Sequence, residues 1–165
     1  NFPAFENILN AELGDPRAVQ LALSAFQTLW DPAESAGWTP ILKESDTLLL
    51  QHNLGDAQVS TLSGQRLARA VGAQLLAPET RTVWGLESVT SPTGSAYIEW
   101  SYSDASPEPT TAEPADPDTD THFCSRQEPY AWEQMDTFFR NGEIQDTCQG
   151  PCQGIRGGFC DARPN

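Results

Sequence analysis

The four cysteines are the residues whose type and spacing point most directly to chemistry. They are Cys124, Cys148, Cys152 and Cys160, separated by 23, 3 and 7 residues. An even number of cysteines in one short segment predicts two disulfide bonds and an oxidising compartment. Four cysteines can pair in three ways, and the sequence does not choose among them. The Cys148/Cys152 pair also admits zinc ligation, although the C-x2-C pairs typical of structural zinc sites are absent.

Three aspartates at alternate positions form a second candidate site. Asp116, Asp118 and Asp120 supply the first three oxygen ligands of a calcium-binding loop. Thr121 stands where such a loop needs glycine, and Gln127 stands where it needs a bidentate glutamate. We therefore expect at most weak Ca²⁺ binding here, and a solvated acidic loop is the alternative interpretation.

Two further positions suggest an acid–base group and a ligand contact. Glu99 lies between Tyr97 and Tyr102 in an expected strand, and in a pocket such a carboxylate can act as a general base. The alternative is a glutamate on an exposed strand face. Trp38 lies in a Pro/Gly loop, residues 31–40, and is a candidate contact for a ligand or partner. A loop tryptophan folded onto the core is the alternative. No G-x-S-x-G, Walker or H-E-x-x-H motif is present.

One stretch resembles the histidine phosphatases. Residues 48–53 resemble the apolar strand that ends in Arg-His-Gly in that family, with His52 as the shared histidine. The family's following helix is similar to the segment that holds Gly64, Ala68, Val71, Gly72 and Leu75. Gln51 and Asn53 replace the arginine and the glycine of the motif. Without that arginine to hold a phosphate, we expect no phosphohistidine mechanism and transfer no residue role.

Charge excludes several classes of partner. The formal net charge is −14 and the pI is near 4.2, with a single lysine and no basic run. Binding to nucleic acid or to anionic lipid requires clustered Lys and Arg, so neither is expected. No apolar run is long enough for membrane insertion. The chain begins at Asn1 without a hydrophobic leader, which predicts a trimmed, secreted form.

The helices are expected where capping residues precede an apolar periodicity. Asp15-Pro16 starts a helix over residues 16–30, whose apolar stripe we expect to pack against the sheet. The stripe consists of Val19, Ala22, Leu23, Phe26, Leu29 and Trp30. Shorter helices are expected around Phe5, from Ser63 to Pro78, and from Pro129 to Asn141-Gly142.

The strands are expected in the middle of the chain. Residues 47–52 indicate a buried strand, and residues 57–62 are expected to pair back across it. Two more strands are expected near 80–90 and 95–103, joined by a turn at 91–94. In the last strand Ala96, Ile98, Trp100 and Tyr102 alternate with more polar positions, so one face should point inward.

These elements predict an α+β fold in which N-terminal helices pack on a small, mainly antiparallel sheet. The expected parts are a core over residues 1–103, an acidic Pro/Thr-rich surface loop over 104–121, and a helix with a disulfide-tied extension over 122–165. The expected function is that of an extracytoplasmic, non-catalytic binding or accessory protein, whose partner is another protein or a small molecule. The alternative is a small hydrolase or lyase with carboxylate and tyrosine chemistry.

Overall fold

In the computed structural model, the described residues are 2–56, 58–103 and 121–155. The chain divides into two compact units, Asn1–Thr39 and Pro40–Asn165. The predicted Ca²⁺ ligands Asp116, Asp118 and Asp120 lie outside the described residues, as does Cys160. No helix among the described residues is both long enough and apolar enough to cross a bilayer.

The first unit is helical. Helices α1 (Phe2–Leu13) and α2 (Pro16–Trp30) pack on each other, and short 3-10 helices follow at Asp31–Ala33 and Ser35–Trp38. The predicted start of α2 is confirmed, because the Asp15 side chain accepts a hydrogen bond from the backbone N–H of Arg17 at 2.9 Å. Burial of the whole apolar stripe is not found. Val19 is the only buried residue of α2, and Phe26 is 43% exposed beside Phe5.

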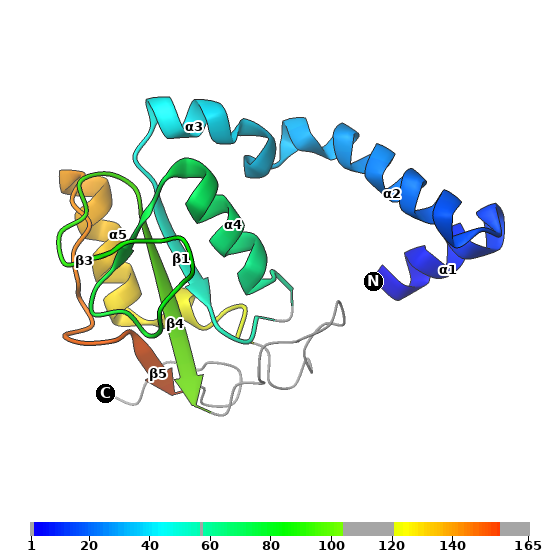
Figure 1. Cartoon of the computed structure of the whole chain (residues 1–165). Coiled ribbons are helices and arrows are strands. Elements are labelled where there is room, and N and C mark those ends of the chain that lie inside the picture. The colour runs from blue at the N-terminus through cyan, green and yellow to red at the C-terminus, as the bar shows by residue number, and fades with distance from the viewer. Residues whose placement is uncertain (1, 57, 104–120, 156–165) are drawn as a thin grey trace. The chain divides into compact units, whose positions relative to one another are not determined.

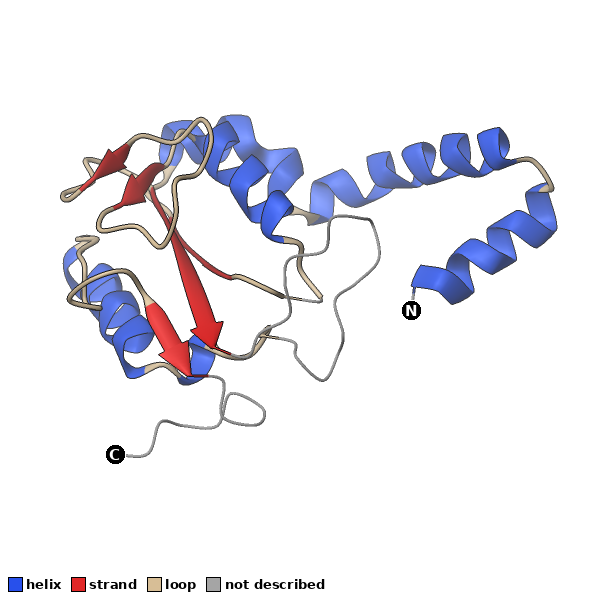
Figure 2. Cartoon of the chain, turned by 60° about the horizontal axis from the view of Figure 1, so that its bottom comes forward, coloured by secondary structure: helices blue, strands red, loops and turns tan. Residues whose placement is uncertain are grey.

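The second unit contains a sheet of parallel strands, so the predicted antiparallel sheet is wrong (Figures 1 and 2). Strand β4 is central and pairs with β1, β2 and β5, while β3 pairs with β2. The strands are β1 (Leu49–Asn53), β2 (Gln74–Leu76), β3 (Ser88–Val89), β4 (Ala96–Ser103) and β5 (Gln153–Ile155). The sheet with helices around it is therefore α/β-like.

The connection from β1 to β2 explains the parallel direction. Residues 57–62 do not pair back as a strand, because helix α4 (Thr61–Val71) begins within them. A helical crossover returns the chain to the starting edge of the sheet, so the next strand runs parallel to the first. Gly72 ends α4 in the left-handed conformation, with φ 72°. Leu75 and Leu76, which were expected to continue the helix, form β2 instead.

Helices lie on both faces of the sheet, and β4 is therefore buried on both sides (Figure 1). On one face, Tyr97 and Leu75 pack with α4 residues such as Ala68. On the other face, Trp100 packs with Ala131 of α5 (Pro129–Asn141). Such double burial is typical of parallel strands. The expected inward face of β4 is correct, but the opposite face is equally buried.

The remaining helical segments of the second unit lie before β1 and before α5. Helix α3 (Thr39–Ser45) contributes Leu42 to the core on the α4 side of the sheet. The predicted end of α5 is confirmed at Gly142, where φ is 72° and the backbone N–H donates to the carbonyl of Phe138. A short 3-10 helix, Ser125–Gln127, precedes α5.

Candidate functional site

A buried carboxylate, that of Glu99 on β4, lies at the centre of the sheet. This residue is 3% exposed. Its Oε1 accepts hydrogen bonds from Gln65 Nε2 at 2.8 Å, from the Tyr97 hydroxyl at 3.0 Å and from Arg81 Nη2 at 3.3 Å. Its Oε2 accepts from Arg81 Nε at 2.6 Å. A buried carboxylate needs such donors, and here they come from α4, from β4 and from the segment after β2.

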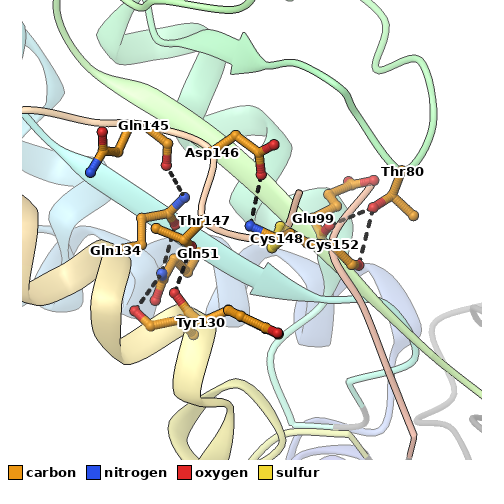
Figure 3. The surroundings of a disulfide bond; sticks show 11 residues. Gln51, Thr80, Glu99, Tyr130, Gln134, Gln145, Asp146, Thr147, Cys148 and Cys152 are labelled. Atoms are coloured by element: carbon orange, nitrogen blue, oxygen red, sulfur yellow. Dashed lines mark hydrogen bonds between the residues drawn. A yellow bond between two sulfur atoms is a disulfide. The ribbon is translucent and has the colours of Figure 1, made fainter. Parts of the chain in front are cut away.

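The segment after β2 is fixed to the centre of the sheet next to this carboxylate. The hydroxyl of Thr80 donates to the backbone carbonyl of Glu99 at 2.7 Å and to that of Cys152 at 3.3 Å (Figure 3). The next residue is Arg81, whose side chain is 37% exposed although its carboxylate partner is buried. The ion pair therefore runs from the buried sheet toward the protein surface.

Only part of the predicted acid–base group comes together. Tyr97 donates to Glu99, but Tyr102 belongs to the opposite face of the sheet, in the core on the α5 side. Side chains alternate along a strand, so residues 97 and 99 share a face that residue 102 does not. Because four hydrogen bonds occupy the Glu99 carboxylate, it lacks the accessible oxygen that a general base needs.

A surface pocket of about 290 Å³ lies at the solvent end of the Arg81–Glu99 pair. Its polar lining includes Gln65, which also bonds Glu99, and Thr82, which follows Arg81 in the chain. The full lining consists of Ser60, Thr61, Leu62, Gln65, Arg81, Thr82, Val83 and Trp84. The start of α4 and the segment after β2 thus form its walls, and the Glu99 hydrogen bonds hold the two segments together.

Trp84 at this pocket is exposed and yet held in place. The residue is 83% exposed. The guanidinium carbon of Arg69 lies 5.5 Å from the centroid of the indole ring, within the range of a cation–π contact. Arg69 Nη1 also donates to the Trp84 carbonyl at 3.1 Å. Gly85, with φ 79°, leaves room for this contact, because a Cβ there would lie 2.9 Å from Arg69 Cδ.

No protein-family model matches the chain, and neither a curated protein nor a solved structure is detectably similar to it.

A second polar cluster joins the turn after β1 to the segment before α5. His122 Nδ1 lies 2.9 Å from Asp56 Oδ2, and the other oxygen of Asp56 accepts from the backbone N–H groups of Gln58 and Val59. His122 Nε2 lies 3.4 Å from Arg126 Nη2. Both ring nitrogens of His122 thus have partners. The cluster therefore cross-links the two segments.

His52, the histidine of the stretch that resembles the phosphatases, packs closely against Tyr97 and Gly64. His52 is at the carboxyl end of β1, and its ring centroid lies 6.4 Å from that of Tyr97. Gly64 of α4 packs so closely on it that a Cβ would lie 2.7 Å from His52 Nδ1. Gln51 points to the opposite face, where its Nε2 donates to Gln134 Oε1 at 2.8 Å. His52 and Gln51 therefore lie on opposite faces of the sheet.

The predicted use of the cysteines in disulfides is confirmed for the described residues. Cys148 and Cys152 are bonded to each other, and Cys124 is also disulfide-bonded. Asp146 Oδ1 accepts from the backbone N–H of Cys148 at 2.8 Å (Figure 3). The carboxylate of Asp146 and the two sulfur atoms lie within 4.8 Å of one another. A disulfide offers no thiolate to a metal, which argues against zinc at this pair.

The Cys148–Cys152 disulfide ties β5 to the loop that follows α5. Within that loop, Thr147 donates to the carbonyl of Tyr130, and Gln134 Nε2 donates to the carbonyl of Gln145 (Figure 3). Gln134 is fully buried. The disulfide and these two hydrogen bonds therefore all fix the loop between α5 and β5.

We expect the paired replacement Cys148→Ala/Cys152→Ala to lower the free energy of unfolding by about 2 kcal/mol, because the disulfide closes a five-residue loop. Urea unfolding of the variant measures the loss. The matched control is Gln149→Ala, which changes an exposed residue within the same loop. An equal loss in both variants would contradict a contribution from the disulfide itself.

Trp38 is not among the residues that line this pocket. It belongs to the first unit, where it is 43% exposed and its indole N–H donates to the carbonyl of Pro32 at 2.8 Å. Sequence reasoning missed Gln65, Arg81 and Trp84. The one local signal was Trp84 directly before Gly85 in a segment without apolar alternation. The pairing of Arg81 with Glu99 had no signal, because 17 residues separate them in the chain.

One acidic group near the segment after β2 has a shifted pKa. Ser88 Oγ donates to Glu79 Oε2 at 2.7 Å, and this hydrogen bond, with a smaller backbone contribution, lowers the pKa of Glu79 below its ordinary value. Glu79 does not line the pocket at Trp84. The lowered pKa of Glu79 therefore reflects its hydrogen bond to Ser88 and has no direct bearing on the pocket.

Proposed function

We propose that this protein is an extracytoplasmic, non-catalytic binding protein, and that its second unit binds a small molecule in the pocket between the start of α4 and the segment after β2. The observation that carries the proposal is the Arg81–Glu99 pair. Four hydrogen bonds hold the carboxylate, and one end of the pair lines the pocket. A fixed polar group in a preformed concave surface is typical of a small-molecule site.

The extracytoplasmic location rests on the cysteines. Disulfides persist in oxidising compartments and are rare in reducing ones. The described cysteines are all in disulfides. The acidic composition, with a net charge of −14, makes nucleic acid and anionic lipid poor partners. The non-catalytic part of the proposal is supported by the carboxylate of Glu99, which already accepts four hydrogen bonds.

A ligand of this pocket is expected to raise the melting temperature of the protein, because it binds the folded state. Screening a collection of neutral, anionic and cationic small metabolites by thermal shift measures this effect. Stabilisation of about 2.7 kcal/mol is expected at a ligand concentration one hundred times Kd. The variant Leu62→Arg places a long side chain at the pocket wall, at an exposed helix position. It should abolish the shift.

The matched control is Ala70→Arg, which changes an exposed position of the same helix that does not line the pocket. It should keep the full ligand-induced shift. A hit that stabilises Leu62→Arg as much as the unchanged protein would show that the ligand binds elsewhere. If no neutral, anionic or cationic metabolite raises the melting temperature, the small-molecule proposal is wrong.

A protein partner is the second candidate, and a specific group of exposed side chains favours it. Phe123 is half exposed, and the guanidinium carbon of Arg126 lies 4.9 Å from its ring centroid. The backbone carbonyl of Arg126 accepts a hydrogen bond from the indole of Trp132, which is 59% exposed. Aromatic residues and arginine are enriched in protein interfaces. This candidate is supported if a second protein co-purifies with the unchanged protein in stoichiometric amount and does not co-purify with the Trp132→Ala variant.

A further inference from the structure

The Trp84 indole offers a flat apolar surface at the pocket. An indole that is 83% exposed gains little from the hydrophobic effect, yet Arg69 holds it by a cation–π contact and by a hydrogen bond to the Trp84 carbonyl. Gly85 provides the space for Arg69. Such a fixed aromatic ring is suited to stacking against a ligand, because little side-chain entropy is lost when the ligand binds.

The groups beside this indole are hydrogen-bonding but carry no net charge. Arg81 is the only charged residue of the pocket lining, and the Glu99 carboxylate balances its charge at 2.6 Å. Gln65 uses its Nε2 for Glu99, while its side-chain carbonyl oxygen has no partner among the described residues. Ser60, Thr61 and Thr82 add hydroxyl groups. No carboxylate of the lining attracts a cation, and a chain with net charge −14 repels anions at long range.

The ligand that fits these features is uncharged, rich in hydroxyl groups, and apolar on one face. A sugar ring has this character, because its C–H groups form an apolar face and its hydroxyls are at once donors and acceptors. The pocket volume of about 290 Å³ lies just below the usual range for small-molecule sites, roughly 300–1,000 Å³. It is therefore matched to one ring or two, and a longer chain would extend into solvent.

Resting on the proposed small-molecule function, we propose that this pocket binds one unit of a neutral oligosaccharide. The C–H face of the sugar packs on the Trp84 indole, and the sugar hydroxyls bond to Gln65, Thr82 and Arg81. The proposal concerns binding alone and includes no bond cleavage, because the Glu99 carboxylate is already occupied.

Isothermal titration of the full chain with neutral hexasaccharides tests the proposal. The probes are cellohexaose, laminarihexaose, xylohexaose, mannohexaose and chitohexaose, with hexagalacturonate as the charged comparison. At least one neutral probe should bind with a micromolar to millimolar Kd. Its Kd should not change between low and high NaCl, since salt screens charges and the ligand has none. Trp84→Ala should weaken binding about tenfold or more, and Thr82→Val should weaken it severalfold.

Trp30→Ala is the matched control, because it removes an exposed tryptophan from α2 and should leave the Kd unchanged. Circular dichroism and melting of each variant establish that it is folded. If none of the neutral probes binds at millimolar concentration, or if folded Trp84→Ala binds as tightly as the unchanged protein, the proposal is wrong. Salt-dependent binding of hexagalacturonate alone would also overturn it. A hit from the metabolite screen that Leu62→Arg abolishes would then still support the proposed small-molecule function.

Discussion

Replacing Trp100 by alanine is expected to lower the free energy of unfolding by about 3–5 kcal/mol. Trp100 is fully buried on β4 and packs in the core on the α5 side of the sheet, which includes Ala131 and Cys124. Truncation removes the largest side chain of that core and leaves a cavity that the surrounding sheet and helix cannot fill. Because small domains are stable by only about 5–15 kcal/mol, the loss is a large part of the total. Urea or guanidinium unfolding monitored by circular dichroism measures it.

Trp84→Ala is the matched control for this experiment. The residue type and the substitution are the same, but Trp84 is 83% exposed, so the change should stay within about 1 kcal/mol, including the lost contact with Arg69. Trp100→Phe should cost less than Trp100→Ala, because it keeps a ring. It also removes an indole N–H that has no hydrogen-bond partner among the described residues. Equal losses for Trp84→Ala and Trp100→Ala would contradict the position of β4 at the centre of the sheet.

Glu99→Ala is expected to lower the free energy of unfolding by about 1–3 kcal/mol, because it removes the shared acceptor of three hydrogen-bond donors, one of which is fully buried. Arg81, Gln65 and the Tyr97 hydroxyl would all lose their shared acceptor. The Tyr97 side chain is fully buried, so its hydroxyl could not replace the lost bond with bulk water. Denaturant unfolding at neutral pH measures the loss, and the pocket ligand should bind less tightly because Arg81 is no longer held.

Glu143→Ala is the control for charge, since it removes an exposed acidic residue and should change stability by less than about 0.5 kcal/mol. A double-mutant cycle of Glu99→Ala with Arg81→Ala should give a coupling energy of about 0.5–3 kcal/mol, because the two side chains share hydrogen bonds. A stable, folded Glu99→Ala protein with a cost below about 1 kcal/mol would show that the carboxylate is not structural. The alternative of acid–base catalysis at Glu99 would then regain support.

Local capping and periodicity were sufficient to predict several elements. Asp15-Pro16 marked the start of α2, and Gly142 marked the end of α5, because caps act within one turn of the helix. The alternation of β4 was visible in residues 96–102 for the same reason, since side-chain direction depends only on the strand itself. The use of the cysteines in disulfides, though not which cysteine pairs with which, followed from their number and clustering, and the described cysteines are all disulfide-bonded.

Strand direction and the pocket were decided by tertiary structure. The apolar pattern of a strand does not encode whether its neighbour is parallel, and the direction here follows from α4, which ends at Gly72 and leaves residues 74–76 free to form β2. The sequence predicted Glu99 to be an exposed strand residue or a general base, because the donors that bond to its carboxylate are distant in the chain. Gln65 precedes it by 34 residues and Arg81 by 18. Only the packing of α4 and the segment after β2 on β4 brings these side chains together, since a buried carboxylate is stable only where distant donors converge on it.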